Sequence, residues 1–582
     1  MRLINTKAFL EREQSMSQGK KVDRRIKVLE LHDDEATSYA VLSHRWVGPT
    51  ELDYEEMVDL AKMDGEERDE IRHRLGYRKI LAVCQQAMGD GYQWVWVDTC
   101  CIDKRSSAEL SEAINSMYRW YANSRVCYAY LHDVPDSVFP SEPNMTTYPH
   151  FGGWPEWFSR GWTLQEMIAP SNVQFFNKDW HLIGDKSVLA PTLSKVTRVP
   201  EHILREGLDG NRPCVAQIMS WAANRTTTRV EDRAYSLMGL LDVNMPMLYG
   251  EGKKAFHRLQ LEIIRSSNDQ SIFAWGYNSP NVRPGSILAD DPSFFEDCSD
   301  MVLMDYDEFL DNLSYYDRGD DTSGAFPITN RGIHIWMPLC SYGYGIGEST
   351  VTEALLPCRS RPNATEIVSI HLSHWNFNYY RYPPASPPGC YRGYRRFSKV
   401  YLRYQDTPSY SVTFKIDDNA MSENGFTCCD VSSPKLTGNS LTVTGVASRP
   451  CVRAYSNSDV RFAVVFGQYF GRDWVDIIQN PPSVFNEDGL VSRAQELAPC
   501  MGYVTRQPQR LDCIWVYHVC LPGSTWIVRT SRIVWASSKI GIRVEVFWDS
   551  AFDRSALNAW GLLCVDVGEY FFLHTCYYYG HL

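Results

Sequence analysis

YQWVWVDTCCID, residues 92–103, is a short apolar run that ends on an acidic, cysteine-containing turn. Residues 94–97 have the aromatic and β-branched composition of a buried strand. In the preceding segment LGYRKILAVCQQAM, residues 75–88, an apolar stripe recurs at helical spacing: Tyr77, Ile80, Leu81, Cys84 and Met88. A second helix is expected after the strand, because Ser106 and Glu109 form the S-x-x-E pattern of a capping box. A strand between two amphipathic helices predicts a parallel α/β sheet.

Three further segments have the composition of short buried strands. They are SYAVLSHRW (38–46), VCYAYLHDV (126–134) and NVQFF (172–176), and the polar turns that follow them are separated by helical patterns. We therefore expect residues 1–190 to form an α/β domain with a mainly parallel sheet.

The pattern changes twice beyond this domain. Residues 191–275 carry helical patterns such as EDRAYSLMGLL and predict a helical extension. The segment GEGKKAF, from Gly250, lacks the G-x-x-x-x-G-K-[ST] spacing of a phosphate loop, so a helix start is expected there. Residues 276–582 alternate short strand-like runs, such as GIHIWMPL and STWIVRT, with Gly, Pro, Asn and Asp. They predict a β-rich domain, a sandwich or a barrel.

Charge and composition exclude several classes of protein. The formal net charge of the 582-residue chain is −12, which opposes a broad grip on nucleic-acid phosphates. One basic and aromatic segment, residues 391–404, is either a surface strand or a single-stranded nucleic-acid site, and we expect the strand. No apolar run approaches the roughly 20 residues of a membrane span. No secretory signal is visible, and the 17 cysteines include no C-x-x-C pair, which predicts reduced thiols, no metal site and a cytoplasmic protein.

Polar clusters follow the predicted strands, where parallel α/β sheets bind ligands. If the sheet is wound as expected, the clusters face one crevice. Each cluster also has a structural interpretation. Ser43 and His44 would satisfy backbone groups at a turn, and Asp98 and Asp103 would cap the following helix or pair with Arg45. Cys100 and Cys101 would be buried apolar groups. A thiol nucleophile with His44 as its base is a remote third interpretation. The clusters are Ser43, His44, Arg45 and Trp46; Asp98, Thr99, Cys100, Cys101 and Asp103; and Arg160, Trp162 and Glu166.

Glu166 lies in SRGWTLQEM, residues 159–167, and has two interpretations. Thr163 and Glu166 fit a capping box, in which the carboxylate folds back on the helix start. Trp162 and Glu166 are also four residues apart, so on a helix they share a face, where an aromatic wall stands beside a carboxylate. The residues alone leave both interpretations open.

Several long blocks, in the right order, resemble one family. YAVLSHRW, WVWVDTCCID, AINSMYRWYANSRVCYAYLHDV and WFSRGWTLQEMIAP look like the successive blocks of the fungal HET (heterokaryon incompatibility) domain. The run RTTTRVEDRAYSLMGLLDVNMPMLYGEGKKAFHRLQLEII resembles the segment that commonly follows that domain. The resemblance covers about residues 39–275.

This resemblance implies a role in non-self recognition, with activation leading to growth arrest or cell death. It also implies a fold similar to the TIR domain, a flavodoxin-like parallel sheet. Many TIR domains cleave NAD with a glutamate in a motif resembling S-x-W-C-L-x-E. Ser159, Trp162, Leu164 and Glu166 sit similarly here, with one residue inserted before the tryptophan and threonine in place of cysteine.

The resemblance therefore implies a catalytic Glu166, with NAD as substrate rather than cofactor. Nicotinamide leaves as a neutral base, so a single carboxylate suffices to stabilise the ribosyl cation electrostatically. Ser43, Arg45, Asp98 and Trp162 would line the cleft, with Arg45 meeting the pyrophosphate. The alternative is a non-catalytic module that acts by self-association through the HET domain. The resemblance also implies an unidentified incompatibility partner protein.

Overall fold

The computed structural model divides into two compact units, each described by itself. The first unit comprises Met1–Asn278, Leu288–Ser314 and Leu356–Ser369, and the second comprises Ser279–Ile287, Tyr315–Leu355 and Ile370–Leu582. The structure describes residues 1–20, 25–63, 65–149, 151–208, 212–279, 282, 285–313, 326–342, 351–361, 366–375, 378–382, 392–405, 411–430, 439–444, 451–458, 460–469, 472–479, 516–521, 526–536 and 539–548.

The first unit contains a seven-stranded mixed sheet in the order β2-β1-β4-β3-β5-β6-β7. Its four central strands, β4, β3, β5 and β6, are parallel, as the sequence predicts. The strands that flank this parallel group, β1, β2 and β7, pair antiparallel and were not predicted. The strands are β1 (Arg2–Asn5), β2 (Leu29–Leu31), β3 (Ala40–His44), β4 (Trp94–Trp96), β5 (Val126–Tyr130), β6 (Val173–Phe176) and β7 (Leu182–Asp185).

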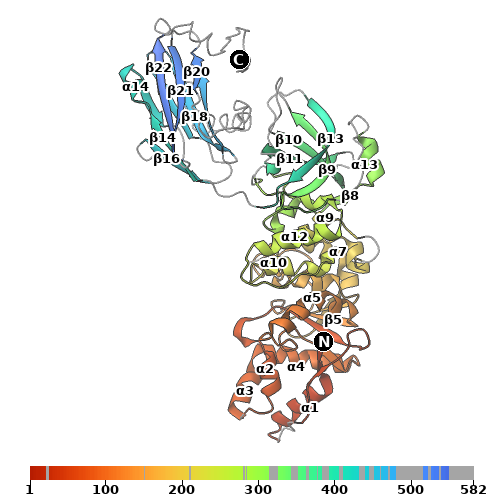
Figure 1. Ribbon diagram of the computed structural model, residues 1–582. Coiled ribbons are helices and arrows are strands. Elements are labelled where there is room, and N and C mark those ends of the chain that lie inside the picture. The colour runs from red at the N-terminus through yellow and green to blue at the C-terminus, as the bar shows by residue number, and fades with distance from the viewer. Residues whose placement is uncertain are drawn as a thin grey trace. The chain divides into compact units, whose positions relative to one another are not determined.

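Helices α4 (Leu75–Gly89), α5 (Ser107–Asn123) and α6 (Thr163–Ile168) connect the parallel strands. The chain runs from β3 to β4 on one side and then back past β3 to β5 on the other. Because such crossovers are right-handed, α4 covers one face of the sheet and α5 and α6 cover the other. Figure 1 shows α1 (Thr6–Ser17) and α4 on one side of β5, and α5 on the other.

The core of this sheet is aromatic. The Trp96 ring of β4 is buried with its centroid 5.7 Å from that of Trp120 and 5.6 Å from that of Tyr121, both on α5. On α4 the predicted apolar stripe is partly wrong, because Met88 is exposed and Val83 is buried instead. The expected capping box of α5 is half formed. Ser106 accepts the Glu109 amide, but the Glu109 carboxylate binds Arg2 and the Asp103 amide.

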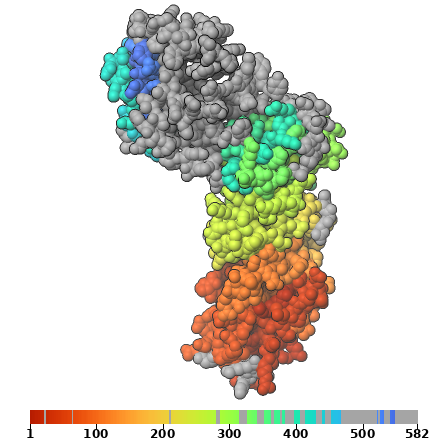
Figure 2. Space-filling view, in the orientation of Figure 1, coloured from red at the N-terminus to blue at the C-terminus, as the bar shows by residue number. Residues whose placement is uncertain are grey.

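The helical segment after the sheet belongs to the same unit and packs against it without a gap on the face that Figure 2 shows. The loop at Gly250 is not a phosphate loop, because the Glu231 carboxylate accepts the amides of Gly250 (2.8 Å) and Gly252 (3.0 Å). A helix then starts at Lys254, as predicted. The helices are α7 (Lys186–Thr197), α8 (Glu201–Glu206), α9 (Val215–Trp221), α10 (Asp232–Tyr235), α11 (Met238–Leu241) and α12 (Lys254–Ser266).

The second unit is built from strands, as its sequence predicts. Two sheets, β16-β14-β22-β21-β20 and β15-β17-β18-β19, share one hydrophobic core and form a sandwich. The core includes Phe414, Phe462 and Val544. The sandwich strands are β14 (Ser411–Asp417), β15 (Thr427–Asp430), β16 (Ser440–Thr444), β17 (Cys451–Ser456), β18 (Arg461–Tyr469), β19 (Arg472–Gln479), β20 (Val516–Cys520), β21 (Trp526–Ala536) and β22 (Lys539–Trp548).

A further sheet holds the basic segment that the sequence analysis singled out. Its central strand β13 (Arg392–Leu402) pairs antiparallel along its length with β9 (Ile333–Tyr342). The Lys399 ammonium lies 5.6 Å from the Trp336 ring centroid across this pair. The segment is therefore a sheet strand, as expected; the neighbouring strands are β10 (Val351–Ser360), β11 (Ile367–Trp375) and β12 (Asn378–Tyr382).

Candidate functional site

The candidate site lies at the carboxyl edge of the parallel strands, where the strand order reverses between β3 and β5. Sheets of this kind bind ligands at such a switch point. Ser43 and His44 are the last two residues of β3 and are buried, with His44 in register with Tyr130 of β5. The prediction that they form a polar turn is wrong, because parallel pairing continues through both residues.

Glu166 meets Ser43 inside the fold. The Ser43 hydroxyl donates to Glu166 Oε2 at 2.5 Å, and the Trp157 indole N–H donates to the Ser43 oxygen at 2.9 Å. Glu166 is only 5% exposed. The structure thus joins two of the predicted clusters, from β3 and from α6, across 123 residues of sequence.

The capping-box interpretation of Glu166 is wrong. Thr163 is the first helical residue of α6, and Trp162 occupies the cap position without a side-chain hydrogen bond. The Thr163 hydroxyl contacts the carbonyls of Trp157 at 2.7 Å and Arg160 at 3.0 Å. The Glu166 carboxylate faces Ser43 rather than the helix start. The spacing of Thr163 and Glu166 made capping plausible, but in the folded chain each side chain hydrogen-bonds another partner.

Burial raises the pKa of Glu166 to about 8, and the negative charge of Asp98 adds to this effect. Hydrogen bonds from Ser43 and Tyr121 and the positive charge of Arg225 act in the opposite direction and are weaker. A carboxyl group with this pKa carries its proton over most of the neutral range, so a small change in its surroundings changes its charge.

Asp98 follows β4 and approaches His44 and Trp46. His44 Nε2 lies 3.4 Å from Asp98 Oδ1, and the Trp46 indole N–H donates to Asp98 Oδ2 at 2.9 Å. Burial is the largest single influence and would raise the pKa of Asp98, but His44, Lys104 and Trp46 together outweigh it and the pKa is lowered. Asp98 is thus a fixed negative charge beside Glu166. The Lys104 ammonium lies 3.8 Å from the centroid of the exposed Trp46 ring.

Two predicted residues are engaged elsewhere. Arg45 forms an ion pair with Glu156 at 2.7 Å and makes no pair with Asp98 or Asp103. Trp162 lies close enough to Asp232 to oppose the rise in the pKa of that carboxyl. The aromatic side chain in direct contact with Ser43 is Trp157, whose indole N–H donates to the serine oxygen.

Cys100 and Cys101 are buried, as their interpretation as apolar groups predicts. Burial raises the pKa of Cys100 well above its usual range, and the Cys101 sulfur accepts the Val97 amide at 3.4 Å. Neither ring nitrogen of His44 makes a hydrogen bond among the described residues. No base is therefore positioned to activate either thiol, and the thiol interpretation loses its support.

Arg225 and Tyr121 belong to the site, although the sequence analysis missed both. Arg225 is 3% exposed and donates to the Arg160 carbonyl at 2.8 Å and to Thr163 Oγ1 at 3.0 Å. Its Nη2 has no hydrogen-bond partner in the described part of the chain, and burial lowers its pKa to about 9. Arg225 follows α9, so no strand-end pattern could have identified it.

Other kinds of site were searched for in the same residues. Within the described ranges, no three His, Cys, Asp or Glu side chains are grouped so as to hold a metal ion. None of the helices described here combines the length and apolar character needed to cross a bilayer.

Comparisons with known proteins agree with the resemblance of the sequence blocks to the HET domain. The family described as "Heterokaryon incompatibility protein (HET)" matches residues 39–149, which contain β3, β4, β5 and the cluster around His44 and Asp98. A "Domain of unknown function (DUF8212)" matches residues 254–286. "Vegetative incompatibility protein HET-E-1" of Podospora anserina is 44% identical over 228 residues. Residues 39–149 of the chain therefore match the HET family.

The HET match ends before Glu166 and Arg225, so the buried cluster extends beyond the matched residues. The aligned residues are 39% of this chain and 16% of the Podospora relative. Two crystal structures of the Xerocomus chrysenteron lectin cover 24% of this chain and 98% and 99% of their own, at 17% identity and TM-scores of 0.18 and 0.17.

Proposed function

We propose that this chain acts in fungal vegetative incompatibility, a form of non-self recognition, and that its HET domain hydrolyses NAD with Glu166 as the catalytic residue. The 44% identity to a vegetative incompatibility protein supports the first part. The parallel strand order β4-β3-β5-β6, which is the 2-1-3-4 start of a flavodoxin-like sheet, supports a TIR-like domain. Activation would lead to growth arrest or cell death through loss of NAD.

The observation that carries the enzymatic proposal is the hydrogen bond between Ser43 and the buried carboxyl of Glu166. It lies at the switch point of the sheet, where ligands are expected, and a negative charge from Asp98 stands beside it. Substrate would reach Glu166 by displacing side chains that now cover it, because the carboxyl is 5% exposed.

The reaction breaks the bond between the ribose C1′ and the nicotinamide nitrogen. The bonding electron pair leaves with nicotinamide, which becomes a neutral base, and C1′ acquires positive charge. Glu166 stabilises that charge in its ionised form, and Ser43 orients the carboxylate. Water then adds to C1′ and releases its proton to Glu166 or to solvent, giving ADP-ribose, nicotinamide and one proton.

The raised pKa of Glu166 links substrate binding to activation. Without substrate, the carboxyl is largely protonated at neutral pH because its pKa is about 8. A nicotinamide cation bound beside it favours the ionised form, since an opposite charge within a few ångströms lowers a carboxyl pKa. The substrate would therefore ionise the group that acts on it.

The second candidate is a non-catalytic signalling module that acts by self-association. The burial of the cluster favours it, because Ser43, His44 and Glu166 are all buried and Ser43 already donates a hydrogen bond to Glu166. In that case the hydrogen bonds only stabilise the domain.

Glu166→Gln separates the two candidates. We expect purified wild-type chain, clustered through a dimerising tag, to convert NAD to ADP-ribose and nicotinamide. The glutamine variant should lose at least about 100-fold in rate while its circular dichroism spectrum is unchanged. Glu142→Gln, which alters an exposed carboxylate of the same domain, should behave as wild type. Growth arrest that survives Glu166→Gln, with no NAD turnover by clustered wild type, would establish the assembly module instead.

A further inference from the structure

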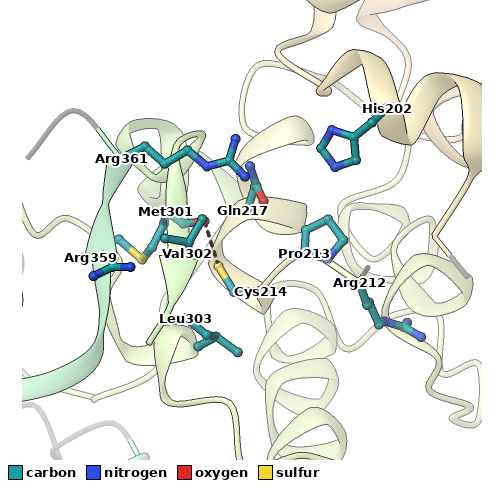
Figure 3. A pocket seen from close by; sticks show the side chains of 10 residues that line it. All are labelled: His202, Arg212, Pro213, Cys214, Gln217, Met301, Val302, Leu303, Arg359 and Arg361. Atoms are coloured by element: carbon teal, nitrogen blue, oxygen red, sulfur yellow. Dashed lines mark hydrogen bonds between the residues drawn. The ribbon is translucent and has the colours of Figure 1, made fainter. Parts of the chain in front are cut away.

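A cavity of about 600 Å³ lies in the first unit, and none of the residues around Glu166 lines it. Its walls come from α8, from the segment that leads into α9, from β8 (Met301–Leu303) and from the end of β10 (Figure 3). These segments are up to 160 residues apart in sequence, and the fold alone brings them together. The volume is in the range that holds small-molecule ligands.

The cavity is basic although the chain as a whole is acidic. Arg212, Arg359, Arg361 and His202 line it, and no Asp or Glu is among the lining residues. Figure 3 shows the Arg361 guanidinium pointing toward Gln217, with His202 on the opposite wall. The Arg361 amide donates to the Asp300 carbonyl at 3.0 Å, which anchors its backbone.

The arginines differ in how far they are neutralised. Arg359 pairs with Glu308 at 2.7 Å, whereas Arg212 reaches the highly exposed Asp242 only at 3.8 Å. No carboxylate pairs with Arg361 in the part of the chain that the structure describes. Positive charge therefore remains in the cavity, and Arg361 is its least compensated member.

The floor of the cavity is firmly held and uncharged. The Cys214 thiol donates to the Met301 carbonyl at 3.4 Å, and the Gln217 carboxamide donates to the Ser299 carbonyl at 2.7 Å. Burial raises the pKa of Cys214 to about 12, so it stays a neutral thiol and adds no negative charge. A polar ligand would thus meet a preformed floor below a ring of cationic side chains.

We propose that this cavity, the arginine pocket, binds a small phosphorylated molecule, with Arg361 as the principal contact. Guanidinium groups bind phosphate oxygens through paired hydrogen bonds, and a diphosphate offers oxygens to more than one arginine. A concave site of this volume favours a small molecule over the extended surface of a nucleic acid. This proposal is independent of NAD cleavage by the HET domain.

Isothermal titration calorimetry of the full chain with inorganic pyrophosphate tests the proposal. We expect saturable binding to the wild type and at least about tenfold weaker binding to Arg361→Ala, because charge-assisted hydrogen bonds are lost. Arg361→Lys keeps the charge but not the planar fork, so its affinity should fall between the two. Arg359→Ala should have a smaller effect than Arg361→Ala, since Glu308 already neutralises Arg359.

The matched control is Arg265→Ala, which removes an exposed arginine of α12 outside the pocket and should leave pyrophosphate binding unchanged. Glu166→Gln should also bind as wild type, which keeps this test separate from the test of the proposed function. Absence of saturable binding to the wild type, or equal binding by Arg361→Ala, would overturn the proposal. So would complete displacement of pyrophosphate by chloride at equal ionic strength, which would reveal only a diffuse ion atmosphere.

Discussion

Two glutamates of the first unit have similarly low exposed fractions but opposite acidity, and the carboxyl of Glu166 is the more deeply buried of the two. Glu166 is 5% exposed and Glu231 is 8% exposed. Burial raises the pKa of Glu166 to about 8, whereas hydrogen bonds from its own amide and from the amides of Gly252 and Gly250 lower the pKa of Glu231. Glu166 has only side-chain hydroxyls as donors and another acid nearby.

The difference shows that low exposure does not decide the charge of a carboxyl group. Backbone N–H groups are fixed donors that favour the ionised form, while burial without such donors favours the neutral form. Glu231 anchors the loop at Gly250, where Gly250 and Gly252 have φ angles of +104° and +60° that favour glycine. Glu166 is instead ready to change its charge when a cation arrives. Four substitutions test this contrast, in decreasing order of expected effect.

Glu166→Gln should change the pH dependence of stability most. Between its ordinary pKa of 4.5 and about 8, the folded chain keeps the Glu166 proton while the unfolded chain releases it. The stabilisation is thus complete below pH 4.5 and is lost as pH rises toward 8, at up to about 1.4 kcal/mol per pH unit and roughly 5 kcal/mol in all. The stability of Glu166→Gln does not fall in this way, because glutamine has no proton to release in this pH range.

The measurement is the difference in free energy of unfolding between wild type and Glu166→Gln, from urea titrations at pH 5 to 8.5. Taking the difference removes the contribution of all other titrating groups. The variant should gain stability over the wild type as pH rises. A difference that stays constant with pH would show that the Glu166 pKa is not raised.

Glu231→Ala should destabilise the first unit by about 1–3 kcal/mol at pH 7, because two amide donors lose their acceptor. The sign of the pH effect is opposite to that of Glu166. The pKa of Glu231 is lowered, so its stabilisation is present above the ordinary pKa and is lost as pH falls. Urea titrations at pH 4 and pH 7 should show a smaller cost at the lower pH. An equal loss of stability at pH 4 and pH 7 would indicate that the charge of Glu231 does not contribute to stability.

Arg225→Gln should raise the pKa of Glu166 further, because it removes the positive charge that opposes the effects of burial and Asp98. We expect the pH midpoint of Glu166 ionisation to rise by roughly one unit, equivalent to about 1.4 kcal/mol. The readout is the midpoint of the pH-dependent stability difference between Arg225→Gln and the double variant with Glu166→Gln. An unchanged midpoint, with only a pH-independent loss of stability, would make Arg225 purely structural.

Thr163→Val should have the smallest effect, a loss of about 1 kcal/mol from its hydroxyl contacts with Trp157 and Arg160. Since Thr163 does not form a capping box with Glu166, the pH midpoint of Glu166 should not move. Urea titration over the same pH series measures both quantities. A shifted midpoint would show that Thr163 acts on Glu166 through Arg225, which donates to the Thr163 hydroxyl.

Much of the first unit could be predicted from local pattern. Short apolar runs mark the four parallel strands, and apolar stripes at helical spacing mark the helices between them. These patterns depend only on neighbouring residues. The flanking antiparallel strands β1, β2 and β7 escaped prediction because their pairing is set by distant partners, such as Ile4 with Val95. In the second unit, the β-rich character was predictable, but which strands share a sheet was not.

The sequence by itself determined the alternation of strands and helices, the residue types at the strand ends and the family blocks of the HET domain. Only the tertiary structure decided that Glu166 faces Ser43 rather than its own helix start, that Arg45 pairs with Glu156, and that Arg225 enters the cluster. The physical reason is the sequence separation over which each kind of interaction acts. Periodicity and capping act over a few residues, whereas burial, charge coupling and hydrogen bonding depend on which distant segments the folded chain brings within a few ångströms.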